Sequence, residues 1–127
     1  MKRFFKMLII LSVMSITTVV FAMSGKEVFD NFCTTCHSPS MAPMFNAPGA
    51  QDSSAWTVRK NDAFDRAVSK NSSISSTTGD EKYEHIINEL LSVATEGTSK
   101  GMPPKGTCAD CTDDELKSVI KFMSSDK

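Results

Sequence analysis

The six residues FCTTCH, at positions 32–37, place two thiols three residues apart and an imidazole directly after the second thiol. This pattern is typical of haem c attachment, in which each cysteine adds to one vinyl group of the porphyrin and the histidine coordinates the iron. Two cysteines at this spacing near the end of a helix can reach both vinyl groups on one edge of the macrocycle. We therefore expect Cys33 and Cys36 to form thioethers with one haem c, and His37 to be the proximal iron ligand.

Two other kinds of site would use the same thiols. A second pair, Cys108 and Cys111, would complete a four-cysteine zinc site, but 71 residues separate Cys36 from Cys108, far more than the loops of a zinc ribbon. A thioredoxin-like redox pair expects a strand before its cysteines and a surrounding sheet, and no segment shows strand alternation. Both alternatives predict a protein without haem.

The residues before the motif indicate export. Residues 1–6 include three basic side chains, residues 7–21 have no charge, and the segment ends in small Ala22, at a position that a signal peptidase reads. We expect a signal peptide over residues 1–22 and one mature haem-binding domain over residues 23–127, exported to the periplasm. The alternative is an uncleaved segment that anchors the domain in the membrane, although the charge-free run is short for a span and contains Ser and Thr.

Net charge limits the partners of this domain. The chain has 14 basic and 15 acidic residues, and residues 1–22 hold three of the basic and none of the acidic ones, so the mature domain has a net charge of 11 minus 15, or −4. This balance argues against nucleic-acid binding. The mature domain has 105 of the 127 residues, which suffice for one domain with a modest core. A haem buried in such a domain would form much of that core.

Helical periodicity dominates the mature chain. A capping box, which is a Ser or Thr followed three residues later by Glu, predicts helix starts at residues 24–27 and 112–115. A short apolar pattern follows residue 61, and the longest amphipathic run begins at Asp80 and ends at Gly97. The expected fold class is therefore all-α.

Three segments between these patterns are predicted to be loops. Residues 38–49 contain three prolines, which argue against a regular helix. Seven of the eleven residues from 69 to 79 are Ser or Thr, so we expect a surface loop there. Residues 98–111 contain glycines and a pair of prolines, and this loop holds Met102.

A haem iron bound by one histidine has a second axial position. The side chain at that position decides whether the haem transfers electrons or binds small molecules. Met102 is our candidate for the distal ligand. Gly101 permits close approach of the backbone, the two prolines after Met102 restrict the chain, and Met102 lies 65 positions after His37, which lets the chain wrap around the macrocycle.

The other candidates for this position fit less well. Met41 and Met44 follow the histidine so closely that their loop would have to cross the ring. Met123 falls on the apolar face of the last helix, where a methionine more often packs than binds metal. His85 is offset from the apolar face of its helix, and we interpret it as solvated.

The second cysteine pair is followed by Thr112 and not by a histidine, so it is not a second haem site of the same kind. Two cysteines three residues apart in an exported loop most simply form a local disulfide, Cys108–Cys111, and a reactive dithiol is the alternative. A disulfide here would rigidify the turn between Met102 and the last helix.

Taken together, these residues resemble small class I c-type cytochromes, and within them the bacterial cytochrome c5 group. The resemblance depends on residues 25–37, on the neighbourhood of Trp56 and Arg59, and above all on GMPPKGTCADC at 101–111, followed by DDEL at 113–116. In that family the methionine of the Met-Pro-Pro run is the distal haem ligand, and a following Cys-x-x-Cys pair forms a disulfide. The segment between residues 59 and 97 departs from the family, because it is longer than such domains usually need.

The resemblance implies an all-α fold in which the N- and C-terminal helices cross and enclose one covalently bound haem. Phe29 or Phe32 would meet Phe122 at that crossing. Lys100 and Lys105 flank the expected distal ligand, and two interpretations of them stay open: two solvated surface lysines, or charges that steer an acidic partner towards the ligand.

The resemblance also implies a one-electron carrier with a His/Met-ligated haem c, and not an enzyme. The expected function is that of a periplasmic monomer that moves electrons between a membrane quinol-oxidising complex and a terminal oxidase or reductase. The competing hypothesis is a haem enzyme or gas sensor with an open sixth iron site.

Overall fold

The structure, a computed structural model, describes residues 20–127, so most of the predicted signal peptide lies outside the described residues. Within residues 20–127 the chain forms helices and no strand, which confirms the expected all-α fold. None of these helices is long and apolar enough to span a membrane. The elements are α1 (Gly25–Val28), a π-helical turn (Phe29–Cys33), α2 (Thr34–His37), α3 (Ala42–Phe45), α4 (Ser53–Lys70), a 3-10 turn (Ser72–Ser76), α5 (Gly79–Glu96), a second 3-10 turn (Pro104–Thr107) and α6 (Asp113–Met123).

The first helical segment begins at the predicted capping box. The Ser24 hydroxyl accepts from the backbone N of Glu27 (3.3 Å), and the Glu27 carboxylate accepts from the backbone N of Ser24 (2.7 Å). From there α1, the π-helical turn and α2 follow one another without a break. Cys33 therefore ends the π-helical turn, and Cys36 and His37 lie in the single turn of α2.

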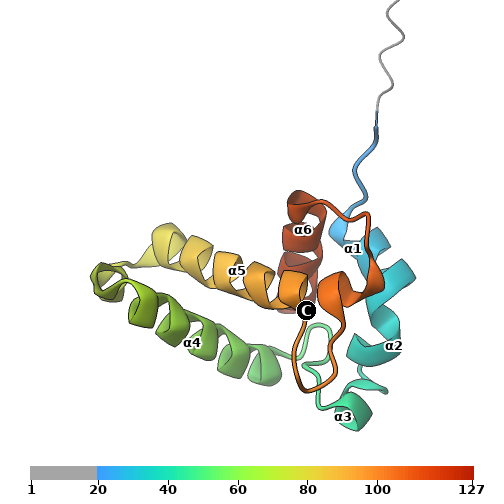
Figure 1. Cartoon of the computed structure of the whole chain (residues 1–127). Coiled ribbons are helices and arrows are strands. Elements are labelled where there is room, and N and C mark those ends of the chain that lie inside the picture. Colours follow the sequence, from blue (N-terminus) through green and yellow to red (C-terminus); the bar gives the residue numbers. More distant parts are fainter. Residues whose placement is uncertain (1–19) are drawn as a thin grey trace, which may run out of the picture.

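Helix α1 packs against α6, as Figure 1 shows. Gly25 permits this contact, because a Cβ at this position would overlap with the carbonyl group of Ser118 and lie 3.1 Å from the Cβ of Phe122. Val28 is fully buried, and the rings of Phe29 and Phe122 have their centroids 5.4 Å apart. The predicted aromatic contact between the first and last helices is thus confirmed for Phe29.

We expect the substitution Gly25→Ala to lower the free energy of unfolding by about 1–3 kcal/mol, because the added methyl group has no space at this crossing. Urea unfolding of the holoprotein would measure the change. Lys26→Ala, on the exposed side of α1, is the matched control and should change stability by less than about 0.5 kcal/mol. Equal stability of the Gly25→Ala variant and the wild type would contradict the tight contact with α6.

Helix α6 also begins at its predicted capping box, and this box has an additional partner. Glu115 is buried, and its carboxylate accepts from the backbone N of Thr112 (2.8 Å) and from the backbone N of Met23 (2.9 Å). These hydrogen bonds, that of Thr112 first, hold the pKa of Glu115 below its ordinary value. One carboxylate therefore caps α6 and fixes the residue that precedes α1 by two positions.

This lowered pKa predicts a specific loss of stability in acid. A carboxyl group with a depressed pKa in the folded state contributes its full stabilisation above its ordinary pKa of 4.5, and this contribution is lost as the pH falls through the folded-state pKa. We expect Glu115→Gln to be less stable than the wild type at neutral pH and to lose less stability on acidification. Thermal unfolding between about pH 7 and about pH 3 would measure this, with exposed Glu81→Gln as the control. Parallel pH curves for Glu115→Gln and the wild type would contradict it.

Helix α4 is longer than the sequence pattern predicts. It begins at Ser53 and not after residue 61, and the side chain of Asp52 caps it by accepting from the backbone N of Ala55 (3.1 Å). The sequence pattern does not indicate the early turns of α4, because Trp56 is their only large buried side chain and the turns therefore show little apolar periodicity. Residues 42–45 also form one turn, α3, which corrects the prediction of an irregular segment; Pro43 lies in its first turn, where a missing N–H costs nothing.

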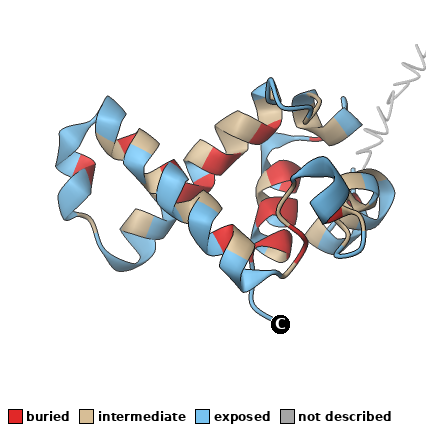
Figure 2. Cartoon of the chain, turned by 90° about the horizontal axis from the view of Figure 1, so that it is seen from below, coloured by how far each residue is buried: buried red, intermediate tan, exposed pale blue. Residues whose placement is uncertain are grey.

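Helices α4 and α5 lie side by side and form a hairpin that projects from the rest of the domain (Figure 1). Ala63 of α4 and Ile87 of α5 are fully buried, and Ile74 is buried in the 3-10 turn within the predicted Ser- and Thr-rich loop. Figure 2 shows that buried residues lie along one side of α4 and α5 and on α6. The hairpin therefore shares its core with α6.

Candidate cofactor-binding site

A cavity of about 590 Å³ lies between α2, α4, α5, α6 and the loop of residues 98–107. Its size falls in the range of about 300–1,000 Å³ that is usual for cofactor pockets. Much of its wall is apolar, with contributions from Phe32, Trp56, Leu90, Val119 and Ile120. The residues predicted to hold the haem all line this one cavity, although they come from distant parts of the sequence: Cys33, Cys36, His37 and Met102.

The imidazole of His37 is oriented by a backbone carbonyl. Its Nδ1 lies 2.8 Å from the carbonyl oxygen of Pro48. Because a carbonyl oxygen only accepts, Nδ1 bears the proton and Nε2 retains its lone pair. The Trp56 indole donates to the carbonyl of Gly49 (2.8 Å), and its ring lies nearly parallel to that of His37, with centroids 6.4 Å apart. Metal-binding histidines are usually oriented in this way, so His37 presents the correct tautomer for an iron ligand.

The two cysteine pairs differ in chemical state. Cys33 and Cys36 are free and half-buried, and burial, with a smaller contribution from Cys36, raises the pKa of the Cys33 thiol to about 11. Reactive dithiols have lowered thiol pKa values, so the first pair does not fit the thioredoxin-like alternative. Cys108 and Cys111 form a buried disulfide, which confirms that prediction. Since both of its sulfur atoms are used, the four-cysteine zinc site is excluded.

The loop that presents Met102 is tied to the helices on both sides. Thr98 holds Met102 at both backbone groups: its Oγ1 accepts from the N of Met102 (3.2 Å), and its own N donates to the carbonyl of Met102 (2.9 Å). Gly97, which ends α5 as predicted, has φ +75°, and a Cβ there would lie 2.6 Å from the Met102 carbonyl oxygen. On the other side, Lys105 Nζ donates to the carbonyl of Cys111 (3.0 Å). The loop therefore depends on α5 and on the segment that starts α6.

The structure brings a second methionine to the cavity. Met123 lines it as well, and this side chain is buried in the core, which agrees with its interpretation as a packing residue. Met44 is 75% exposed on α3, and neither Met44 nor Met41 lines the cavity. His85 is half-buried on α5 and lies outside the cavity wall.

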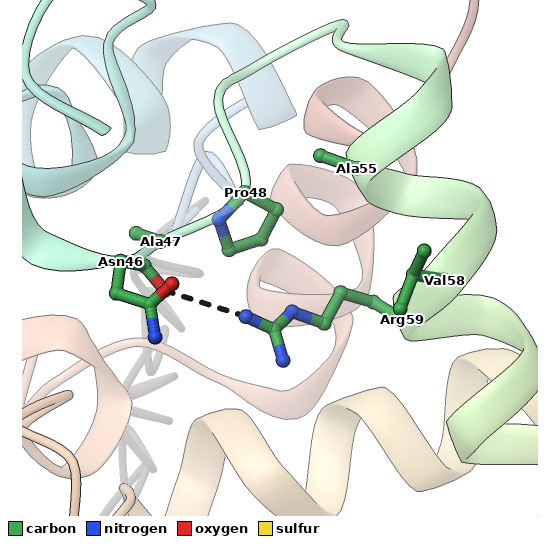
Figure 3. Close-up of a pocket in the computed structure, with 6 residues that line it drawn as sticks. All are labelled: Asn46, Ala47, Pro48, Ala55, Val58 and Arg59. Carbon is green, nitrogen blue, oxygen red and sulfur yellow. Dashed lines mark hydrogen bonds between the residues drawn. The ribbon is translucent and has the colours of Figure 1, made fainter. Parts of the chain in front are cut away.

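Two arginines of the cavity wall were not predicted as site residues. The family resemblance includes the neighbourhood of Arg59, and no sequence pattern indicates Arg66. A helix that begins at residue 53 places the two on one face, seven positions apart. Arg59 also borders a smaller adjoining pocket of about 360 Å³ (Figure 3). There its guanidinium reaches towards the loop and donates to the carbonyl of Asn46 (3.3 Å).

Comparison with known proteins identifies the family. The chain matches the family described as "Cytochrome C oxidase, cbb3-type, subunit III" over residues 21–123. The chain belongs to this cytochrome c family. The matched range includes the α4–α5 hairpin, which contains most of the segment predicted to depart from the family.

Individual cytochromes are similar over most of their length. This cytochrome is 37% identical to cytochrome c5 of Azotobacter vinelandii over 103 residues, which cover 81% of this chain and 94% of the relative. It is 31% identical to cytochrome c5 of Ectopseudomonas mendocina (81% and 90% covered) and 29% identical to cytochrome c-555 of Chlorobaculum tepidum (80% and 73% covered). No solved structure matches the chain. The resemblance to the cytochrome c5 group is thus confirmed, and the protein is a cytochrome c5-like haem protein.

Proposed function

We propose that this cytochrome is a one-electron carrier with a single covalent haem c. Cys33 and Cys36 would hold the haem through thioethers, with His37 and Met102 as the two axial iron ligands. The main support is that these four side chains line one largely apolar cavity of about 590 Å³. The lone pair left on His37 Nε2 by the hydrogen bond to Pro48, and the two free thiols, also fit this cofactor.

The bound haem would supply the one-electron chemistry, and the chain would set how readily it occurs. The Pro48 carbonyl keeps His37 in one tautomer and orientation. A thioether from Met102 favours the ferrous state and raises the reduction potential. An apolar wall acts in the same direction, because it disfavours the more highly charged ferric site. Occupation of both axial positions would also exclude small ligands.

The cellular setting forms part of the proposal. Residues 1–22 would direct the domain to the periplasm, where a monomer would move electrons from a membrane quinol-oxidising complex to a terminal oxidase or reductase. An uncleaved leader would instead anchor it in the membrane. Lys100 is exposed, whereas Lys105 is hydrogen-bonded to the carbonyl of Cys111, so Lys100 is the better candidate for steering an acidic partner.

Optical spectra of the exported protein test this function. Red colour that survives acid-acetone extraction indicates covalent haem, and a colourless product would favour a haem-free protein. We expect low-spin bands in the reduced state, a weak band near the red end of the spectrum in the oxidised state from Met–iron charge transfer, and no change on addition of carbon monoxide. A five-coordinate spectrum would favour the haem enzyme or gas sensor. Intact mass would show whether the chain begins at Met23.

A further inference from the structure

The predicted end of the signal peptide coincides with a sharp change in packing. Before this point, the side chains of Val20 and Phe21 are both 87% exposed, and Ala22 is exposed as well. After it, the side chain of Met23 packs against the core of the domain. The backbone N of Met23 also donates to the buried carboxylate of Glu115, at 2.9 Å. The packed domain therefore begins at the residue that cleavage after Ala22 would make the first.

The carboxylate of Glu115 has hydrogen-bond donors but no cation beside it in the described part of the chain. Its oxygens accept from the backbone N of Met23 and from the backbone N and hydroxyl of Thr112. No Lys, Arg or His side chain of residues 20–127 forms an ion pair with it. Glu115 is only 7% exposed, and a carboxylate so far removed from water is costly unless an opposite charge accompanies it. A cation at the position of the Met23 nitrogen would supply that charge.

Hydrolysis of the peptide bond between Ala22 and Met23 would create such a cation. A signal peptidase adds water across this bond, so that the hydroxyl group of the water joins the carbonyl carbon of Ala22 and the Met23 nitrogen becomes a primary amine. The amine takes one proton from the water and one that the new carboxyl group of Ala22 releases. An α-amine has an ordinary pKa of about 7.7–8.0, so near neutral pH the nitrogen is mostly an ammonium with three N–H donors.

We propose that cleavage after Ala22 creates an ion pair between the new α-ammonium of Met23 and the carboxylate of Glu115. This inference rests on the export and cleavage that form part of the proposed function. Hydrogen bonds from a cation to a carboxylate have lengths of about 2.7–2.9 Å and are roughly twice as strong as neutral ones. The present distance of 2.9 Å meets this requirement, so the ion pair needs no rearrangement of the chain.

This ion pair would link processing to the helix crossing beside the cofactor cavity. Glu115 lies in the first turn of α6, and Met23 lies two residues before α1, so the chain enters α1 beside the start of α6 (Figure 1). Helix α6 lines the cavity with Leu116 and Val119, among others. The domain would therefore gain stability at the step that releases it from its leader, and the mature terminus would be a structural part of the fold.

A variant with one alanine inserted between Ala22 and Met23 removes the charge from this position. Cleavage should still occur after Ala22, because a cut one residue later would place Phe21 at the third position before the bond, which the A-x-A-like pattern disfavours. The processed variant then begins with the added alanine, and the Met23 nitrogen is again an amide. The ammonium lies one residue further out, about 3.8 Å along the chain. Intact mass identifies the first residue of each protein.

Urea unfolding of the exported holoprotein near neutral pH then gives a double-mutant cycle. We expect Glu115→Gln to lower the ratio of folded to unfolded protein about fivefold more in the wild-type chain than in the chain with the added alanine. The reason is that only the wild-type chain has an ion pair to lose. Glu81→Gln, an equal change of charge at an exposed position of α5, is the control and should have the same effect in both chains.

Chemical labelling of the α-amine gives a test that leaves Glu115 unchanged. An amine held as an ammonium by a carboxylate reacts slowly with an amine-reactive ester, because only the deprotonated amine is a nucleophile. We expect the α-amine of the wild-type chain to be labelled several times more slowly than that of the chain with the added alanine. The mass of the N-terminal peptide separates this label from labels on lysines.

The outcomes separate this proposal from the proposed function. An equal effect of Glu115→Gln in both chains, or equal labelling rates of the two α-amines, would overturn the ion pair. A mature chain that begins at a residue other than Met23 would also overturn it. The carrier function is judged separately by acid-acetone extraction and the optical spectra, which do not depend on the first residue of the chain.

Discussion

Replacement of both Cys33 and Cys36 by alanine should give a colourless exported protein that does not fold. Without thioethers the haem is not retained, and the cavity of about 590 Å³ loses its occupant. The apolar side chains that line this cavity would then lose their packing partner, in a domain whose own core is modest. Acid-acetone extraction and far-ultraviolet circular dichroism would measure the loss of haem and of helix.

The second cysteine pair provides the control for this experiment. Cys108→Ser combined with Cys111→Ser removes the disulfide but leaves the attachment cysteines intact, so this variant should stay red. Its stability should fall by about 2 kcal/mol, because the disulfide closes only a short loop. If the Cys33 and Cys36 double variant also stayed red after extraction, covalent attachment through these two thiols would be disproved.

Met102→Ala should open the sixth iron position. We expect the oxidised protein to lose the charge-transfer band near the red end of the spectrum, and the reduced protein to bind carbon monoxide. The midpoint potential should fall by on the order of 0.1 V or more. This is a modest part of the range of about 0.8 V over which axial ligands set haem potentials. Optical titration with carbon monoxide and a redox titration would measure both effects.

Met123 is the matched control, because it is the other methionine of the cavity wall. Met123→Leu nearly conserves volume, so it should cost less than about 1.5 kcal/mol of stability and leave the optical bands unchanged. The opposite pattern, with altered bands in Met123→Leu and normal bands in Met102→Ala, would assign the distal ligand to Met123.

Features determined by neighbouring residues were predictable from the sequence. Both capping boxes, the end of α5 at Gly97 and the Cys108–Cys111 disulfide depend on side chains within a few positions of one another. The contact of Phe29 with Phe122 is long-range, and its prediction came from the family resemblance and not from periodicity.

Features that depend on tertiary packing were not predictable in the same way. The first turns of α4 are helical because Trp56 packs into a core built by distant elements, and their own sequence is largely polar. The Pro48 carbonyl that orients His37 is a backbone group, and a backbone acceptor has no signature in the sequence. The sequence does not indicate that Arg59 and Arg66 lie on one wall of the cavity. Their placement depends on α4 being one continuous helix and on which of its faces lines the cavity.

The attachment of Met102 to Thr98 at both backbone groups has a consequence for the speed of electron exchange. A sulfur ligand on a loop held in this way has little freedom to move when the charge of a bound iron changes. We therefore expect a small reorganisation energy for the redox couple, so that self-exchange between two molecules is limited by their encounter and not by rearrangement around the metal.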